Sequence, residues 1–61
     1  MSAKFELYKD VGGKFRFRLI APNGEIIAEG QHYESKESCL KGIESIKANA
    51  SKAEIVDSSI T

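Results

Sequence analysis

The residues of this sequence that could perform chemistry are few and widely spaced. Cys39 is the only cysteine and His32 the only histidine among the 61 residues. A thiolate is stabilised near the N-terminus of a helix, and Cys39 lies close to the start of a predicted helix. It shares the apolar stripe of that helix with Ile43 and Ile46, however, and free cysteine is among the most buried residue types. We therefore predict that Cys39 packs in the core.

His32 and Tyr33 could belong to a site carried by a loop. A catalytic triad or a zinc site needs further partners at suitable spacing, and one histidine with one distant cysteine supplies neither. Gly12, Gly13 and Lys14 do not form a phosphate-binding loop, because the preceding spacing and a following Ser or Thr are missing. The sequence therefore predicts no catalytic residue, no metal site and no cofactor.

Basic and aromatic residues alternate from Lys14 to Arg18. Such a run on a sheet can stack bases and contact phosphate, so Lys14, Arg16 and Arg18 form a candidate anion-binding surface. The alternation places the arginines opposite the aromatic face, where Glu6 and Glu29 can pair with them across strands. We favour a solvated ladder of charges, and weak binding of single-stranded nucleic acid or another anion is the alternative.

Alternating apolar and polar residues predict an antiparallel meander with one apolar face. Its strands span Lys4–Lys9, Lys14–Ile20 and Ile26–Glu29. A three-residue loop over Asp10–Gly12 would place Leu7 opposite Phe15, which keeps the apolar residues of the first hairpin together.

The register of the second hairpin is open. Pro22 suits the first central position of a type I turn, and Gly24 can take a positive φ. A two-residue Asn-Gly turn would place Ala28 opposite Leu19, whereas a type I turn with a glycine bulge would place Ile27 there. We favour the bulge because proline fits its turn directly.

The segment Ser35–Ala50 has the periodicity of an amphipathic helix. Its apolar residues recur on one face: Cys39, Leu40, Ile43, Ile46 and Ala50. Ser35 suits the N-cap, and Asn49 suits a left-handed residue after the last turn. Gly42 lies at the edge of the apolar stripe, where we expect it to permit a close packing contact.

A last short strand is predicted over Ala53–Asp57, which gives the order β-β-β-α-β. We expect one α+β domain over residues 1–61, with the helix covering the meander. A domain this short buries only about 60% of the surface that its unfolded chain exposes. The single cysteine excludes an internal disulfide, so a partner chain is the expected supplement to the core.

The charge balance excludes a strong general attraction to polyanions. Nine basic and nine acidic side chains give a formal net charge of zero, so we expect neither nucleic acid nor an anionic membrane as a partner. No apolar run approaches the ~20 residues that cross a bilayer. We expect a soluble, cytoplasmic protein.

Several short motifs follow one another in a specific order and spacing over nearly the whole chain. They are Phe5–Lys9, Phe15–Leu19, Asn23–Gly24, Tyr33, Ser35–Lys36, Cys39, Gly42–Ile43 and Asn49–Ala50. In these motifs the chain resembles the YegP-like family of small bacterial proteins of unknown function. The resemblance implies a β3-α-β unit, present as two tandem copies or as two chains, that builds one sheet and exchanges last strands. It implies no catalytic residues.

The sequence itself also favours such an exchange. The outer strands of the meander lack a proline that would blunt pairing, and Ile55 and Val56 point to opposite faces, as suits a strand buried on both sides. We predict a homodimer with exchanged C-terminal strands, whose interface includes Ala53, Ile55 and Val56.

The functional hypothesis is a non-enzymatic homodimeric interaction module that binds a further protein or a small molecule. The alternative is anion binding through the basic strand face. A third hypothesis is an enzyme whose site is composed from both chains.

Overall fold

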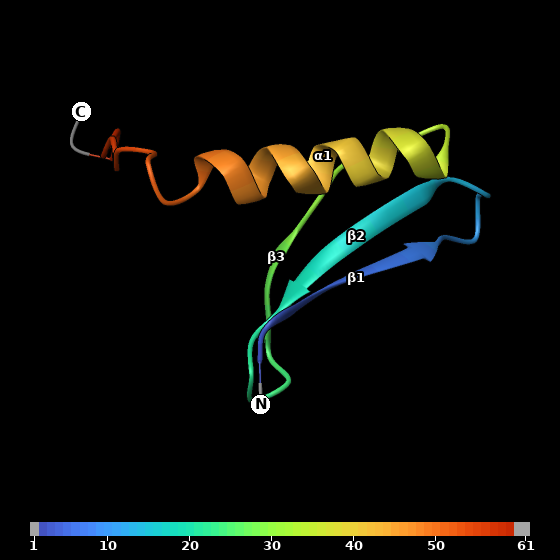
Figure 1. Ribbon diagram of the computed structural model, residues 1–61, viewed down its shortest axis with the longest axis horizontal. Coiled ribbons are helices and arrows are strands. Elements are labelled where there is room, and N and C mark those ends of the chain that lie inside the picture. The colour runs from blue at the N-terminus through green and yellow to red at the C-terminus, as the bar shows by residue number, and fades with distance from the viewer. Residues whose placement is uncertain (1, 60–61) are drawn as a thin grey trace.

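The computed structural model describes residues 2–59, which form a three-stranded sheet and one helix. The elements are β1 (Lys4–Lys9), β2 (Phe15–Ile20), β3 (Ile26–Glu29) and α1 (Lys36–Asn49). The strands form an antiparallel meander in the order β1-β2-β3, and α1 lies along one side of it (Figure 1). The predicted α+β class, with a meander covered by one helix, is confirmed. Within residues 2–59, no helix is long and apolar enough to cross a membrane.

The first hairpin keeps the predicted facing of its side chains but not the predicted pairs. Leu7 lies opposite Phe17, so the prediction that it opposes Phe15 is wrong. The loop has the predicted length of three residues, but it occupies residues 11–13 instead of 10–12. Moving the loop by one residue moves every pair by two, and this leaves the apolar residues on a common face.

The side chain of Asp10 explains why the loop begins one residue later. Its Oδ1 accepts hydrogen bonds from the N–H groups of Gly12 at 2.9 Å and Lys14 at 3.0 Å. The Asp10 N–H donates to the Lys14 carbonyl at 2.8 Å, which makes these two residues the last pair of the hairpin. Gly13 then takes the left-handed position, with φ 84°. The carboxylate thus organises the turn from within.

We predict that Asp10 makes the stability of the domain depend on pH. Its hydrogen bond from the Lys14 N–H lowers the pKa of the carboxyl below its ordinary value of 3.8. The stabilisation is complete above 3.8 and is lost as the pH falls through the lower pKa of the folded state. Asp10→Asn should therefore flatten the decline of the melting temperature between neutral pH and values below 3.8. Parallel declines in wild type and variant, measured by circular dichroism, would contradict this role.

The second hairpin has the predicted turn. Ala21 N–H donates to the Glu25 carbonyl at 2.8 Å, and Gly24 N–H donates to the Ala21 carbonyl at 2.8 Å. Gly24 has φ 91°. This pattern is typical of a type I turn closed by a glycine bulge, with Pro22 at its first central position.

A second irregularity then changes the register. Ile20 lies opposite Ile26, as the turn requires, but the register shifts between Leu19 and Ile20. Leu19 consequently lies opposite Ala28, so the favoured pairing of Leu19 with Ile27 is wrong. Ile26 and Ile27 are 47% and 56% exposed. The extra residue in β3 therefore leaves both isoleucines accessible to solvent.

The helix begins as predicted and ends differently. Ser35 has extended backbone, and its Oγ accepts a hydrogen bond from the Ser38 N–H at 3.1 Å. The prediction of a left-handed Asn49 is wrong, because only glycines have a positive φ within residues 2–59. Asn49 stays helical, and its Nδ2 donates to the Ser45 carbonyl at 2.8 Å.

The core lies between the sheet and the first half of α1. Its buried residues are Phe17, Cys39 and Ile43. Four half-buried residues pack against them: Phe5, Leu7, Phe15 and Tyr33. The Phe17 ring meets Phe5 edge-on at 6.0 Å and stacks on Tyr33 at 6.2 Å between ring centroids. The fold is therefore held by a small aromatic cluster.

Two glycines permit close approaches to this cluster. A Cβ at Gly42 would overlap the end of the Tyr33 side chain, which confirms the predicted packing contact. A Cβ at Gly30 would lie 2.8 Å from Cδ2 of Phe17, and two further ring atoms would be closer still. Both contacts are too short for any side chain, so glycine is required by space at these positions.

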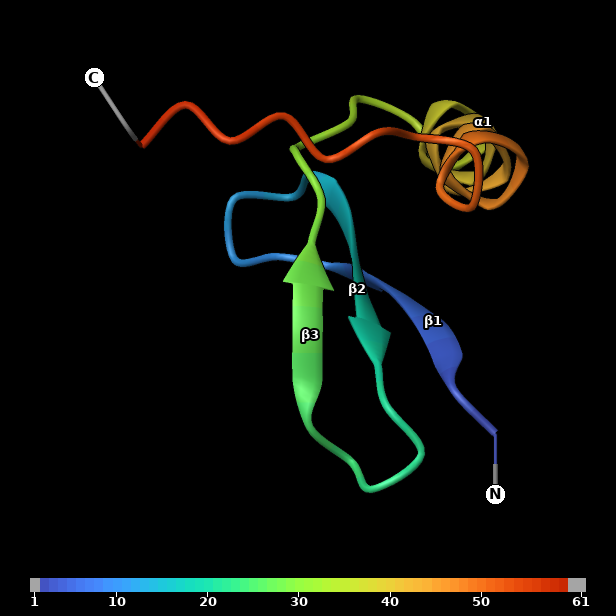
Figure 2. The ribbon, with the colours of Figure 1, turned by 90° about the vertical axis from the view of Figure 1, so that its left-hand side faces the viewer.

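The predicted fourth strand does not form within a single chain. Ala53–Asp57 has no regular structure, and Figure 2 shows the segment running away from the end of α1 on its own. Neither β1 nor β3 of the same chain pairs with it. The helix ends beyond the sheet, and a segment without a neighbouring strand has no partners for its backbone groups.

Candidate functional site

The candidate anion-binding surface is a row of ion pairs on β2. Arg18 Nε donates to Glu6 Oε1 at 2.6 Å, and this hydrogen bond raises the pKa of the guanidinium. The guanidinium also lies 4.6 Å from the centre of the Tyr8 ring. Arg18 is therefore engaged on two sides by residues of β1.

Arg16 and Lys14 have acidic partners from other parts of the chain. Arg16 Nη2 lies 4.0 Å from Glu29 Oε1 and donates to the Gly30 carbonyl at 3.4 Å. Its Nε is buried and has no hydrogen-bond partner within residues 2–59. Lys14 pairs with Glu34. Each of the three cations thus faces a different carboxylate.

This arrangement supports the charge ladder that the alternation predicted. Glu6 and Glu29 lie where cross-strand pairing was expected. The partner of Lys14 was not predicted, because Glu34 belongs to no strand. It reaches β2 through the bridge between Phe15 and Tyr33, which is a tertiary contact without a local signal in the sequence.

Cys39 is fully buried, as predicted, with no accessible surface. Burial raises the pKa of its thiol, which disfavours the thiolate that a nucleophile or a metal ligand requires. The side chain packs with Phe17 and Ile43 in the core. Its position therefore fits packing and does not fit covalent chemistry.

We predict that Cys39→Ser destabilises the domain by about 1–3 kcal/mol, because a hydroxyl would be buried without an assured partner. The free energy of unfolding measured with denaturant tests this. The native thiol should also react slowly with iodoacetamide. A matched control is a cysteine at the exposed position 51, Ser51→Cys in the Cys39→Ser background, which should react fast. Equal rates would show that Cys39 is accessible.

His32 lies on the surface near the first hairpin. Its Nδ1 is 3.9 Å from Asp10 Oδ2, while the other oxygen of Asp10 is held by the turn. Residues 2–59 contain no cluster of three or more His, Cys, Asp or Glu side chains that could hold a metal ion. The histidine therefore adds one long polar contact to the loop.

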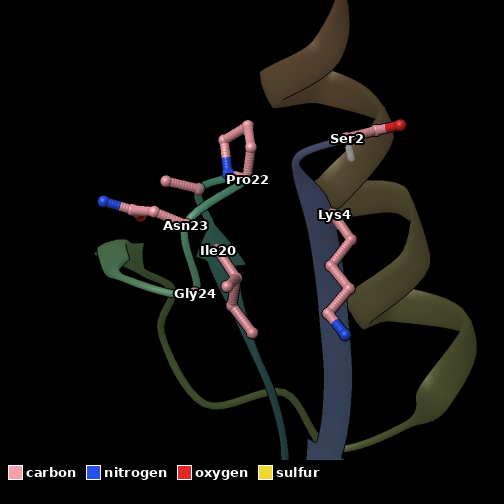
Figure 3. Close-up of a pocket in the computed structure, with 7 residues that line it drawn as sticks. Ser2, Lys4, Ile20, Pro22, Asn23 and Gly24 are labelled. Carbon is pink, nitrogen blue, oxygen red and sulfur yellow. The ribbon is translucent and has the colours of Figure 1, made fainter.

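An open hollow lies at the opposite end of the sheet, below the second turn. Figure 3 shows Lys4 and Ile20 lying along neighbouring strands, with Pro22 and Asn23 on the turn beside them. Lys4 is the only charged residue in its lining, and no second polar side chain converges on its amine. One exposed amine over an apolar floor does not define a ligand site.

The predicted interface residues are all exposed. Ile55 is 97% and Val56 78% accessible, and Ala53 is exposed as well. None of the three lies in the hydrophobic core. The sheet has two open edges, β1 and β3, since only β2 has a neighbour on both sides. A free apolar segment and two unpaired edges thus occur in one small chain.

Comparison with known families identifies the chain. A family model described as a domain of unknown function, DUF1508, matches residues 10–57. The chain belongs to the DUF1508 family. This confirms the family that the YegP-like motifs predicted.

Members of the DUF1508 family with high identity are described only as UPF0339 proteins. The protein from Treponema denticola is 60% identical over 57 residues, which cover 93% of this chain and 98% of the relative. The protein from Methanosarcina acetivorans is 59% identical over 54 residues, which cover 88% of this chain and 93% of the relative. The relatives include archaeal proteins, so the expectation of a bacterial family was too narrow.

Another DUF1508 relative is about twice as long. A protein from Stutzerimonas stutzeri is 52% identical over 50 residues, which cover 82% of this chain but only 45% of that relative. The aligned unit therefore leaves room in the longer chain for a second one of similar size.

Two solution NMR structures share the fold of this DUF1508 chain. A protein from Haloferax volcanii has a TM-score of 0.86 at 41% identity, covering 93% of this chain and 97% of that one. A protein from Agrobacterium tumefaciens has a TM-score of 0.77 at 45% identity, covering 90% and 89% of the two chains. Neither description names an activity or a ligand.

Proposed function

We propose that this chain is a non-enzymatic interaction module that works as a homodimer, in which two copies exchange the segment Ala53–Asp57. One observation carries the proposal: Ile55 and Val56 are 97% and 78% exposed on a segment that pairs with nothing in its own chain. Burying an aliphatic side chain of this size stabilises by about 1.5–3 kcal/mol, so covering these residues in both copies supplies core that a single chain lacks.

The open edges provide a place for the exchanged segment. An edge strand presents unpaired N–H and C=O groups, and a strand from a second copy satisfies them. Neither β1 nor β3 contains proline. The longer relative from Stutzerimonas stutzeri adds support, because a chain with room for two units could assemble the same pair covalently.

The side chains support a binding role over a catalytic one. The thiol is buried, the histidine lies on the surface, and the three cations of β2 each face a carboxylate. Catalysis by nucleophile and base requires such groups within hydrogen-bond reach of one another. A site composed from two chains would need residues that only the dimer brings together.

Light scattering coupled to gel filtration tests the proposal. At micromolar concentration we expect twice the chain mass of 6.7 kDa. Ile55→Asp should yield the monomer, whereas Val11→Asp, on the tip of the first hairpin, should leave the dimer intact. Both positions are highly exposed in the single chain, so the pair is matched in burial. A wild-type monomer at these concentrations would overturn the proposal.

The anion-binding alternative predicts a different result. A labelled single-stranded oligonucleotide should bind at low salt, and its affinity should fall steeply as salt is raised. With Lys14, Arg16 and Arg18 each facing a carboxylate, we expect no binding even at low salt. Salt-sensitive binding that Arg16→Glu abolishes would favour the alternative.

A further inference from the structure

The two open edges of the sheet differ in regularity. β1 has six residues, and every one of them pairs with β2 without a shift. β3 has four residues and carries the register shift beside Ile27. A short, bulged strand is a common protection against further pairing, whereas a long, regular edge accepts another strand readily. The backbone therefore favours β1 as the receiving edge.

The charges of the two edges also differ. β1 begins and ends with the exposed residues Lys4 and Lys9, and neither forms an ion pair within residues 2–59. The Lys9 amine instead lies 5.1 Å from the centre of the Phe15 ring. β3 contains no cation; it ends in Glu29 and is preceded by Glu25. One edge is basic at its ends and the other is acidic.

The C-terminal segment complements the basic edge. Its charged residues, Glu54 and Asp57, are both acidic and form no ion pair within the described part of the chain. Beside β3 they would approach Glu25 and Glu29, and like charges on adjacent strands are destabilising. Beside β1 they would approach lysines.

We infer that the β1 edge of one copy receives the segment Ala53–Asp57 of a second copy, and that the lysines of β1 attract its acidic side chains. Centring the segment on β1 places Ile55 beside Leu7, which is half-buried on the covered face of the sheet. Val56 then lies on the outer face, near Glu6 or Tyr8 according to the strand direction. This inference rests on the proposed dimer and specifies its contact.

Paired cysteines test the edge directly. In a Cys39→Ser background, Val56→Cys is combined with Glu6→Cys, with Tyr8→Cys or, as the matched control on the other edge, with Glu29→Cys. Each pairing needs the two Cα atoms within about 7 Å, so only neighbouring strands can cross-link. After mild oxidation we expect disulfide-linked dimers with position 6 or 8 and none with position 29. Cross-linking through position 29 alone would overturn the assignment.

A charge exchange tests the same contact without cysteines. Lys4→Glu with Lys9→Glu, or Glu54→Lys with Asp57→Lys, should each weaken the dimer in light scattering, and the four changes together should restore it. Lys36→Glu, at an exposed lysine on α1, should leave it unchanged. A dimer that all these variants leave intact would refute the β1 assignment while sustaining the exchange, whereas a wild-type monomer would refute the exchange itself.

Discussion

Removal of residues 53–61 should abolish the dimer and leave a chain that no longer unfolds cooperatively. The truncated chain keeps all of β1, β2, β3 and α1. It also keeps the three buried core residues, so no core contact within one chain is lost. A chain of this size is marginal by itself, and the partner's segment is what we expect to complete its core.

Light scattering and thermal unfolding followed by circular dichroism measure the two effects. Removing only residues 58–61 is the control, because it spares Ala53–Asp57 and should leave both the dimer and the transition unchanged. A truncated chain that unfolds sharply at the melting temperature of the full chain would show that three buried residues suffice. In that case the apolar segment would serve another purpose.

Local patterns in the sequence were sufficient for most of the elements. The alternation along Lys4–Lys9 gave the bounds of β1, and Ser35 marked the start of α1. The facing of the side chains also followed, because a shift of the loop by one residue changes the pairs but not the face. These features depend on residues that are close together in the chain.

Features that depend on distant residues could not be predicted. The Asp10 carboxylate moved the first loop by accepting two backbone hydrogen bonds. The bulge at Ile27 had no signal, because two adjacent isoleucines fit either register. Glu34 meets Lys14 only after the chain has folded. The strand expected over Ala53–Asp57 lacks a partner in its own chain, so a single copy does not form it.

Gly30 was another unmarked position, and its substitution should destabilise the domain strongly. A Cβ at Gly30 would overlap the Phe17 ring, which is 3% exposed and stacked on Tyr33. The Gly30 N–H donates to the Phe17 carbonyl at 3.0 Å, which holds the two backbones together. Neither the ring nor the backbone can move away without disturbing the core.

We expect Gly30→Ala to cost about 3 kcal/mol, at the upper end of overpacking in a well-packed core. For a domain of this size that corresponds to a fall in melting temperature of at least about 12 °C. Gly12→Ala is the matched control, because the nearest atom to its Cβ would be Asp10 Oδ1 at 3.5 Å, an ordinary contact. Phe17→Leu should recover part of the loss when combined with Gly30→Ala, since a smaller side chain relieves the overlap. Equal melting temperatures for the Gly30 and Gly12 variants would mean that the ring of Phe17 moves freely, and the aromatic cluster could not then be what holds the fold.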